Sequence, residues 1–316
     1  MRKISWPIIA LSTVSVIALA VFYLHTPDSA DLVTDVRGEI SNGAFDRANA
    51  RVESYQLQNG DTSELAAAIS WLARGALAAQ DYTAADLYAN RARNMGLQLL
   101  GNGDIDNDRW LPTAIGAGIE VHAQVLDHQG KKAEGAAFLK AELEKYRDTS
   151  IAQRISKNIN LLSLVGSPAP AIEAPEWLGE QPASLASLRG KPVLLFFWAH
   201  WCPDCKADVP IIANVMRRYS SQGLQLVAPT QYYGYAARGE DATPAEEKVW
   251  IQSVQDRFYA PLENFASVPI SNENFQTYGC STTPTLAIVD KNGNVSWYHP
   301  GAATEAELVR EVEKVL

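Results

Sequence analysis

Two cysteines three residues apart, Cys202 and Cys205, are the residues whose type and spacing most directly indicate chemistry. They follow a continuous apolar run from Val193 to Trp198, which predicts a buried strand that gives way to a helix at the cysteines. Free backbone N–H groups and the dipole at a helix N-terminus stabilise a thiolate. We therefore expect Cys202 to be the nucleophile and Cys205, about one turn later, to be the resolving thiol that closes a disulfide with it.

The residues beside the cysteines leave part of this chemistry open. Pro203 suits the first turn of the expected helix, where its missing N–H would have had no partner. A protonated His200 would lower the pKa of the Cys202 thiol, a neutral one could shuttle protons, and a surface imidazole would do neither. Asp204 acts against a nearby thiolate, so these residues alone do not settle the direction of electron flow.

The number of cysteines limits the other kinds of site. The chain has three, too few for a disulfide scaffold or for a four-cysteine zinc site, and we expect no metal and no cofactor. The third cysteine, Cys280, stands at an apolar strand position and is expected to be a small core residue. A third redox thiol and an intermolecular disulfide are the alternatives for it.

Further segments accompany the cysteine pair in a recognisable order. They are Gly166-Ser-Pro-Ala-Pro170, Ser187-Leu-Arg-Gly-Lys-Pro-Val193, Trp201-Cys-Pro-Asp-Cys205, Tyr278-Gly-Cys-Ser-Thr-Thr-Pro284-Thr and Ile288-Val-Asp-Lys-Asn-Gly293. With them, residues 166–316 resemble the thioredoxin superfamily, and more narrowly the TlpA/ResA-like, membrane-anchored thiol–disulfide oxidoreductases. The resemblance implies a thioredoxin-like α/β fold and protein thiols and disulfides as substrates.

The resemblance also implies roles for single residues. Pro284 matches the cis-proline that faces the cysteine pair, and the backbone of Thr283 would bind a substrate peptide. Asp208 stands where this subfamily carries a carboxylate that helps to move the proton of the resolving thiol. Its alternative role is that of an acid near the start of a helix, favourable to the helix dipole. The buried acid of the original thioredoxins is replaced by Phe196, which leaves Asp208 as the candidate.

Aromatic residues complete the expected site. Trp201 precedes the first cysteine of the motif and is expected at the active site. Tyr232 and Tyr233 lie in the segment Tyr232-Tyr-Gly-Tyr235, which follows a predicted strand. In this fold such loops border the active-site face, so the tyrosines are expected to form a rim for an unfolded substrate segment. Ordinary packing is the alternative.

The elements that must position these residues alternate between strands and helices. Short apolar runs predict strands at 224–228, 285–289 and 295–298, and Asn292-Gly293 predicts a hairpin before the last one. Helical patterns cover 244–259 and 304–316. Residues 164–316 are thus expected to form one compact α/β domain.

Residues 31–163 follow a different pattern, rich in alanine and helical throughout. Three similar stretches, at 43–45, 80–82 and 130–132, are each followed three residues later by a small residue, and they predict turns between paired helices. The stretch around Tyr82, with Leu72 before it and Ala85, Ala89 and Ala92 after it, resembles a tetratricopeptide (TPR) repeat. A plain helical bundle is the alternative.

The sequence of residues 1–30 predicts a membrane segment. The run from Ile4 to Leu24 has no formal charge, and at about 1.5 Å per residue it would measure about 31 Å, the thickness of the hydrocarbon core of a bilayer. Arg2 and Lys3 precede it, so the N-terminus is expected on the cytoplasmic side and the rest on the periplasmic or extracytoplasmic side of the inner membrane. A cleaved signal peptide is the alternative.

Composition excludes one large class of function. The chain has 316 residues, 27 Lys+Arg and 36 Asp+Glu, a net charge of −9, so nucleic-acid binding is not expected. We expect an extracytoplasmic reductase of protein disulfides. The resemblance implies a transmembrane thiol reductase as electron donor and apocytochrome c cysteines among the targets. The alternatives are thiol oxidation or disulfide isomerisation by the same cysteines, and a partner-binding helical scaffold that carries a regulatory redox domain.

Overall fold

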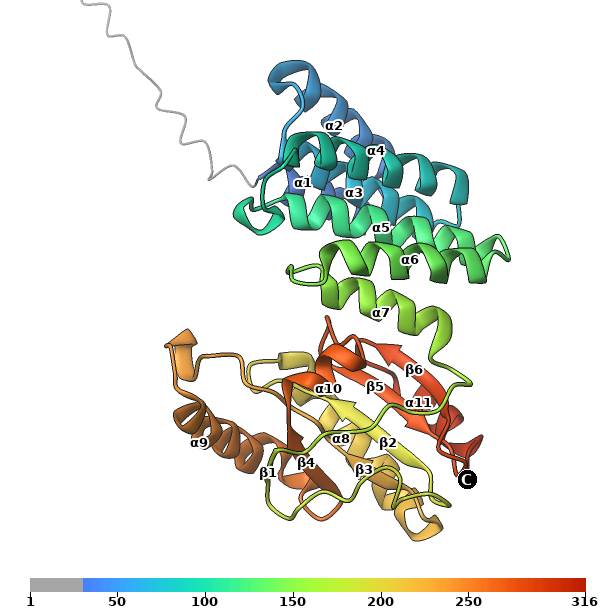
Figure 1. Ribbon diagram of the computed structural model, residues 1–316, viewed down its shortest axis with the longest axis vertical. Coiled ribbons are helices and arrows are strands. Elements are labelled where there is room, and N and C mark those ends of the chain that lie inside the picture. The colour runs from blue at the N-terminus through green and yellow to red at the C-terminus, as the bar shows by residue number, and fades with distance from the viewer. Residues whose placement is uncertain (1–30) are drawn as a thin grey trace, which may run out of the picture.

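The computed structural model describes residues 31–316, which form two halves stacked along the long axis of the molecule (Figure 1). The first half is helical and the second contains the sheet. The expected membrane segment, Ile4 to Leu24, lies outside the described residues. Within residues 31–316, every helix is too short or too polar to span a bilayer.

The helical half consists of antiparallel helix pairs. The turns at 42–44, 79–81 and 129–131 lie where the sequence predicts them, and the small residues Ala48, Ala85 and Gly135 are buried behind them. A Cβ on Gly135 would lie 3.1 Å from the Ala123 carbonyl oxygen, which explains the small residue there. The helices are α1 (Leu32–Ser41), α2 (Phe45–Asn59), α3 (Ser63–Ala78), α4 (Tyr82–Leu100), α5 (Leu111–His128), α6 (Lys132–Tyr146) and α7 (Ala152–Ser163).

The second half is built on a six-stranded sheet of order β1-β4-β3-β2-β5-β6. Strands β2, β3 and β4 are parallel, and β5 and β6 continue the sheet antiparallel to their neighbours. The strands are β1 (Glu176–Leu178), β2 (Val193–Phe197), β3 (Gln225–Val227), β4 (Ala266–Ile270), β5 (Thr285–Val289) and β6 (Val295–Pro300); the helices are α8 (Pro203–Tyr219), α9 (Pro244–Val254), α10 (Asn272–Thr277) and α11 (Glu305–Glu313).

Strand β2 is buried on both faces, as its apolar run predicts. Leu194 and Phe196 belong to the core under α8 and α11, whereas Leu195 and Phe197 belong to the core under α10. Because side chains alternate along a strand, one continuous apolar run serves both cores. This central strand leads directly into Trp198 and the active-site loop.

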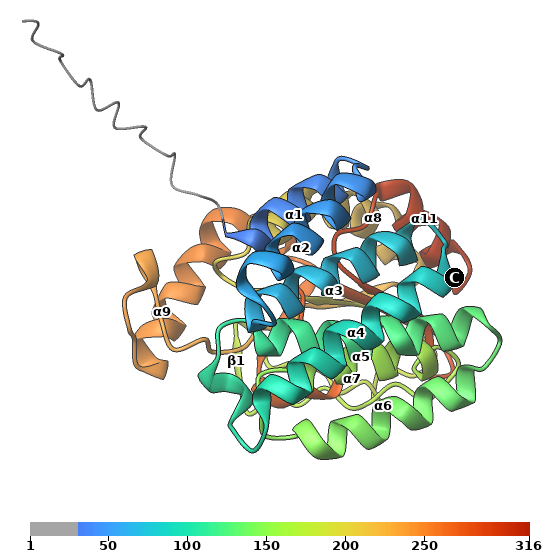
Figure 2. The same cartoon turned by 90° about the horizontal axis from the view of Figure 1, so that it is seen from above.

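The structure corrects one expected helix boundary and adds strand β4. The helix expected over 244–259 ends at Val254 and continues as one π-helical segment, Gln255–Tyr259, which places the Tyr259 ring 4.2 Å from that of Trp198. Strand β4 was not predicted because it contains Pro269, which cannot donate a ladder hydrogen bond. Helix α9 lies at the edge of the molecule in both views (Figures 1 and 2).

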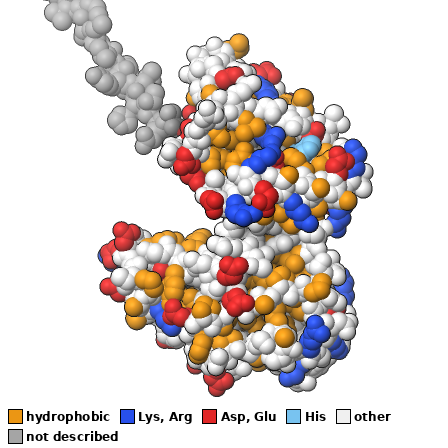
Figure 3. All heavy atoms as spheres, viewed as in Figure 1, with side chains coloured by type: hydrophobic (Ala, Val, Ile, Leu, Met, Phe, Trp, Pro, Cys, Tyr) orange, Lys and Arg blue, Asp and Glu red, His pale blue; other side chains and the backbone are white. Residues whose placement is uncertain are grey.

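The two halves meet where α7 packs against α10 and β6. The side-chain amides of Gln153 and Asn160 donate to the carbonyl oxygens of Phe275 and Thr277, at 3.1 and 3.0 Å. Away from this junction the surface is indented between the two lobes (Figure 3).

At Gly279 the two halves approach each other closely. It has a positive φ of 61°, and a Cβ there would lie 2.4 Å from the backbone nitrogen of Lys157. Only glycine, which has no Cβ, can adopt this φ and also fit this close to the Lys157 backbone. Since Gly279 precedes the loop that ends at Pro284, the helical half is packed against the segment that approaches the cysteines.

Candidate active site

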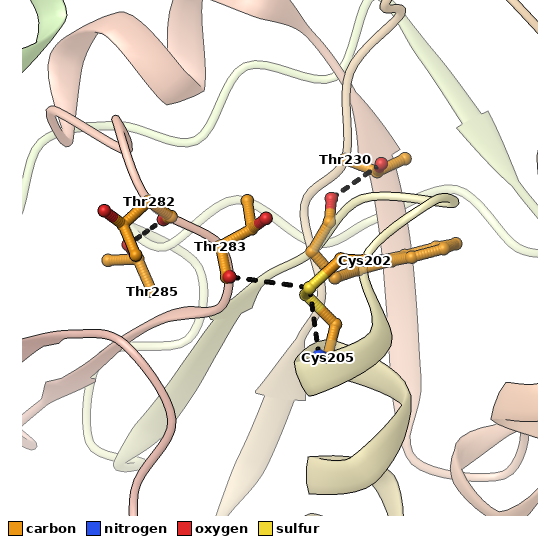
Figure 4. The surroundings of a disulfide bond; sticks show 7 residues. Cys202, Cys205, Thr230, Thr282, Thr283 and Thr285 are labelled. Atoms are coloured by element: carbon orange, nitrogen blue, oxygen red, sulfur yellow. Dashed lines mark hydrogen bonds between the residues drawn. A yellow bond between two sulfur atoms is a disulfide. The ribbon is translucent and has the colours of Figure 1, made fainter. Parts of the chain in front are cut away.

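The cysteine pair lies where β2 ends and α8 begins. Cys202 is the N-cap of α8, and its Sγ accepts a hydrogen bond from the backbone N–H of Cys205 at 3.0 Å (Figure 4). The two cysteines form a disulfide with a Cα–Cα distance of 5.4 Å, as expected. Pro203 occupies the first helical position and is exposed. In the reduced protein, the free N–H groups of this helix end would stabilise a thiolate on Cys202.

A second loop faces the disulfide. The peptide bond between Thr283 and Pro284 is cis, and the Thr283 carbonyl oxygen lies 3.4 Å from Cys202 Sγ (Figure 4). The Thr285 hydroxyl donates to the Thr282 carbonyl at 2.7 Å, which fixes the start of β5 beside this turn. The structure therefore brings Thr283 and Pro284 to the cysteines.

Asp208 lies behind the pair, one turn after Cys205 on α8. It is 5% exposed, and its Oδ2 has no hydrogen-bond partner. Burial raises the pKa of Asp208 to about 6, and the nearby charge of Asp204 adds to this, while the backbone N–H of Ala303 and the side chain of His299 oppose it. A carboxyl group in this condition can take up and release a proton near neutral pH.

The structure buries His200, and the surface-imidazole alternative is wrong. His200 is 2% exposed, and its Nε2 lies 3.1 Å from Oε1 of Glu247 on α9. Burial lowers the pKa of His200 even though the carboxylate beside it acts the other way. The imidazole is therefore neutral near pH 7.

Glu247 is the residue that sequence reasoning missed. It is fully buried and accepts hydrogen bonds from the backbone N–H groups of Tyr233 and Gly234, at 2.7 and 2.8 Å. Its neighbour Glu246 is exposed and forms a capping box with Thr243. A pair of adjacent glutamates in the first turn of a helix signals only an N-terminus, so nothing local distinguished the buried one.

The active-site loop is tied to the loop after β3 by several further hydrogen bonds. The Trp198 indole donates to the Ala228 carbonyl at 3.0 Å, and the Thr230 hydroxyl donates to the Trp198 carbonyl at 2.9 Å (Figure 4). Together with the His200–Glu247 contact, these bonds fix the loop that carries the tyrosines relative to the cysteines.

The aromatic residues expected at the rim make two kinds of contact. Trp201 is 46% exposed and meets the Tyr233 ring edge-on at 5.5 Å, and Tyr233 also packs against His200 at 5.6 Å. Tyr232 makes a different contact, because its hydroxyl donates to Glu176 on β1 at 3.0 Å. Trp201 and Tyr233 thus lie together beside the cysteines, whereas Tyr232 is hydrogen-bonded to Glu176 on the edge strand β1.

Cys280 is a buried, unpaired thiol in the core under α10. Burial raises its pKa well above the usual range, although a hydrogen bond with Thr285 acts against this. A thiol that stays protonated and covered is a poor nucleophile, so Cys280 is the small core residue that its position predicts. Within residues 31–316, His, Cys, Asp and Glu side chains form no group of three that could hold a metal ion.

Comparison with known proteins agrees with this geometry. A family model described as Redoxin matches residues 164–316. The thiol–disulfide oxidoreductase ResA of Geobacillus kaustophilus (strain HTA426) is 25% identical over 151 residues, which cover 48% of this chain and 78% of that protein. ResA of Bacillus subtilis (strain 168) is 28% identical over 142 residues, 45% of this chain and 70% of its own length.

Solved structures align with slightly less than half of the chain. A thioredoxin-family thiol:disulfide interchange protein from Chlorobium tepidum TLS is 22% identical, with 47% of this chain and 95% of that one covered and a TM-score of 0.36. An exposed lipoprotein thioredoxin from Streptococcus pneumoniae strain TIGR4 is also 22% identical, with 46% and 99% covered and a TM-score of 0.37. From the site geometry and the sequence relatives, residues 164–316 are a redoxin-type, thioredoxin-like domain related to the ResA thiol–disulfide oxidoreductases, and the chain is a thiol–disulfide oxidoreductase of the thioredoxin-like kind.

Proposed function

We propose that this oxidoreductase works as a reductase of protein disulfides, with Cys202 as the attacking thiol. The observation that carries the proposal is the position of Cys202 Sγ. It caps α8, accepts the Cys205 N–H and lies 3.4 Å from the Thr283 carbonyl. A substrate strand that paired with the Thr283 backbone would bring its own disulfide to this sulfur.

The proposed reaction moves two electrons from the reduced cysteine pair to the substrate. The Cys202 thiolate attacks one sulfur of the substrate disulfide, that bond breaks, and one substrate sulfur leaves as a thiolate that takes up a proton. Asp208 accepts the proton of Cys205, whose thiolate then attacks Cys202 Sγ in the mixed disulfide. The second substrate thiol leaves, and the protein is left with the Cys202–Cys205 disulfide.

The charges around Cys202 support the reducing direction. A low thiol pKa stabilises the reduced pair and makes it oxidising, as in the strongest oxidants of this fold. Here His200 is buried and neutral, so it adds no positive charge, while Asp204 and Glu247 are carboxylates and Lys206 is a cation. Apart from the helix dipole, the nearby formal charges thus sum to a negative value, which keeps the thiol pKa from falling far.

The remaining parts of the molecule support a setting for this reaction. We propose that Thr283, Pro284, Pro203, Trp201 and Tyr233 contact an unfolded substrate segment. The charge-free run in residues 1–30 supports membrane anchorage with the described residues on the extracytoplasmic side, where a transmembrane thiol reductase would supply electrons. The paired helices of residues 31–163 support a TPR-like region that binds a partner.

Insulin reduction tests the proposal. With dithiothreitol as electron source, the wild-type protein should accelerate cleavage of the insulin disulfides, and Cys202→Ser should abolish the acceleration. Cys280→Ser is the matched control and should keep full activity. A redox titration gives the direction: a potential near about −270 mV agrees with a reductase, and one near about −120 mV indicates a thiol oxidase.

A further inference from the structure

A buried carboxylate lies next to the active site without a formal positive charge against it. Glu247 is fully buried, and its three hydrogen-bond partners are the N–H groups of Tyr233 and Gly234 and the Nε2 of His200. Neutral backbone donors can stabilise a buried carboxylate, but they leave its charge uncompensated. An ionised Glu247 therefore extends its negative potential through the low-dielectric interior toward the cysteines.

The same contact fixes the state of His200. An ionised carboxylate can only accept hydrogen bonds, so beside an ionised Glu247 the His200 Nε2 is the donor and the ring carries its proton there. The groups facing the ring are Glu247 from α9, Lys206 from α8, and the rings of Tyr233 and Tyr235 from the loop after β3. Burial and Lys206 both oppose a second proton.

From this arrangement we infer that Glu247 is a positioning residue that sets the reduction potential of Cys202–Cys205. It holds His200 as a neutral donor and places a negative charge behind the loop that ends at Cys202, which disfavours the Cys202 thiolate and makes the pair more reducing. The inference rests on the proposed function and gives a physical source for its direction.

The expected effect is a shift of the equilibrium with glutathione. Removing the charge of Glu247, which contacts the residue two positions before Cys202, should change the thiol–disulfide equilibrium constant by about three- to tenfold, and tenfold corresponds to about 30 mV. Glu247→Gln should move the potential toward oxidising values by this amount. The pH midpoint for alkylation of reduced Cys202 by iodoacetamide should fall in parallel.

Two further variants separate this charge effect from a structural one. Glu246→Gln removes the neighbouring, exposed carboxylate on the same helix and should leave the potential unchanged. His200→Gln keeps a side-chain N–H donor but removes the imidazole; because that ring is neutral, the equilibrium constant should change less than twofold. If Glu247→Gln does not fold, as judged by its thermal unfolding, His200→Gln still tests whether His200 is neutral, and a more reducing potential in that variant still overturns the inference.

The outcomes divide clearly. A shift toward oxidising potential in Glu247→Gln, with none in Glu246→Gln, supports the inference. An unchanged potential in a folded Glu247→Gln protein overturns it, as does a more reducing potential in His200→Gln, which would mean that a cation had been removed. The reduction potential of the wild-type protein tests the proposed function separately. A value near that of strong oxidants would refute the proposed reductase activity, even if Glu247→Gln shifts the potential as expected.

Discussion

Replacing Asp208 by asparagine should separate the two thiol-transfer steps, because in the proposed mechanism the carboxylate serves only the second. The side chain is buried one turn beyond Cys205, and its pKa of about 6 lets it accept a proton near neutral pH. Asparagine has a similar size but cannot take up the Cys205 proton. Attack by Cys202 should continue, whereas resolution of the mixed disulfide should become slow.

The magnitude follows from the pKa. A general base of this kind contributes about 100-fold or more, so Asp208→Asn should slow resolution about 100-fold at pH 7, where about 90% of wild-type Asp208 is ionised. At pH 5 only about 10% of it is ionised, and the ratio of wild-type to variant rates should fall to about tenfold. Comparing the two proteins at each pH cancels the titration of the thiols themselves.

Stopped-flow mixing of reduced protein with a peptide disulfide measures this ratio. The first peptide thiol should appear at the same rate in both proteins, and the second should be delayed in the variant while a mixed disulfide accumulates. Asp204→Asn, an exposed carboxylate on the same helix turn, is the matched control. A ratio that does not depend on pH between 5 and 7, or an equal delay in Asp204→Asn, would refute the role of Asp208.

The same pKa has a consequence for stability. Since the native state holds the Asp208 proton more tightly than the unfolded chain, this group stabilises the fold fully below about pH 4 and loses that contribution as the pH rises through about 6. Asp208→Asn should therefore be more stable than the wild type at pH 8, by about 1 to 3 kcal/mol, and similar to it at pH 4. Urea unfolding at the two pH values measures the difference; equal stability at pH 8 would contradict the buried setting.

Three further predictions concern the framework. Gly279→Ala should lower stability by about 1 to 3 kcal/mol, since its Cβ would meet the Lys157 backbone at 2.4 Å; a change within 0.5 kcal/mol by urea unfolding would argue against this junction. Gln80 has a positive φ of 62° at the turn position where the other two hairpins carry glycine, so Gln80→Gly should raise stability by about 0.5 to 1 kcal/mol, and a loss of stability would contradict the shared turn geometry. Cys280 should resist iodoacetamide in the native reduced protein and react only after unfolding; rapid native labelling, followed by mass spectrometry, would show that the thiol is accessible.

Much of the fold was predictable because its signals are local. The run of β2, the proline at the start of α8 and the turn residues of the helix pairs each act within a few positions of the chain, and the structure places these elements where they predict. Strand β4 was not predicted because a proline in the sequence argues against a strand. Pro269 is tolerated in this strand because few inter-strand hydrogen bonds form at its position. The three-residue β1 at the sheet edge is too short to leave a pattern.

The chemistry of the site also has a local part that the sequence predicts and a long-range part that it does not. The pairing of Cys202 with Cys205 follows from their spacing on one helix turn, whereas the state of His200 depends on Glu247, which lies 47 residues away. Neither the burial of that glutamate nor its hydrogen bonds to the loop after β3 leaves a trace in the neighbouring sequence. The direction of electron transfer, which depends on such charges, could therefore not be derived from the sequence alone.

Trapping of mixed disulfides tests the central claim most directly. In a Cys205→Ser protein, a substrate disulfide attacked by Cys202 cannot be resolved, so the substrate should stay bound to Cys202 until dithiothreitol is added. The matched Cys202→Ser protein should capture nothing, because Cys205 is fully buried behind it. Mass spectrometry of the trapped species that finds the substrate on Cys202 is the result our account predicts. Equal capture on Cys205 in the Cys202→Ser protein, or no capture in either, would contradict it.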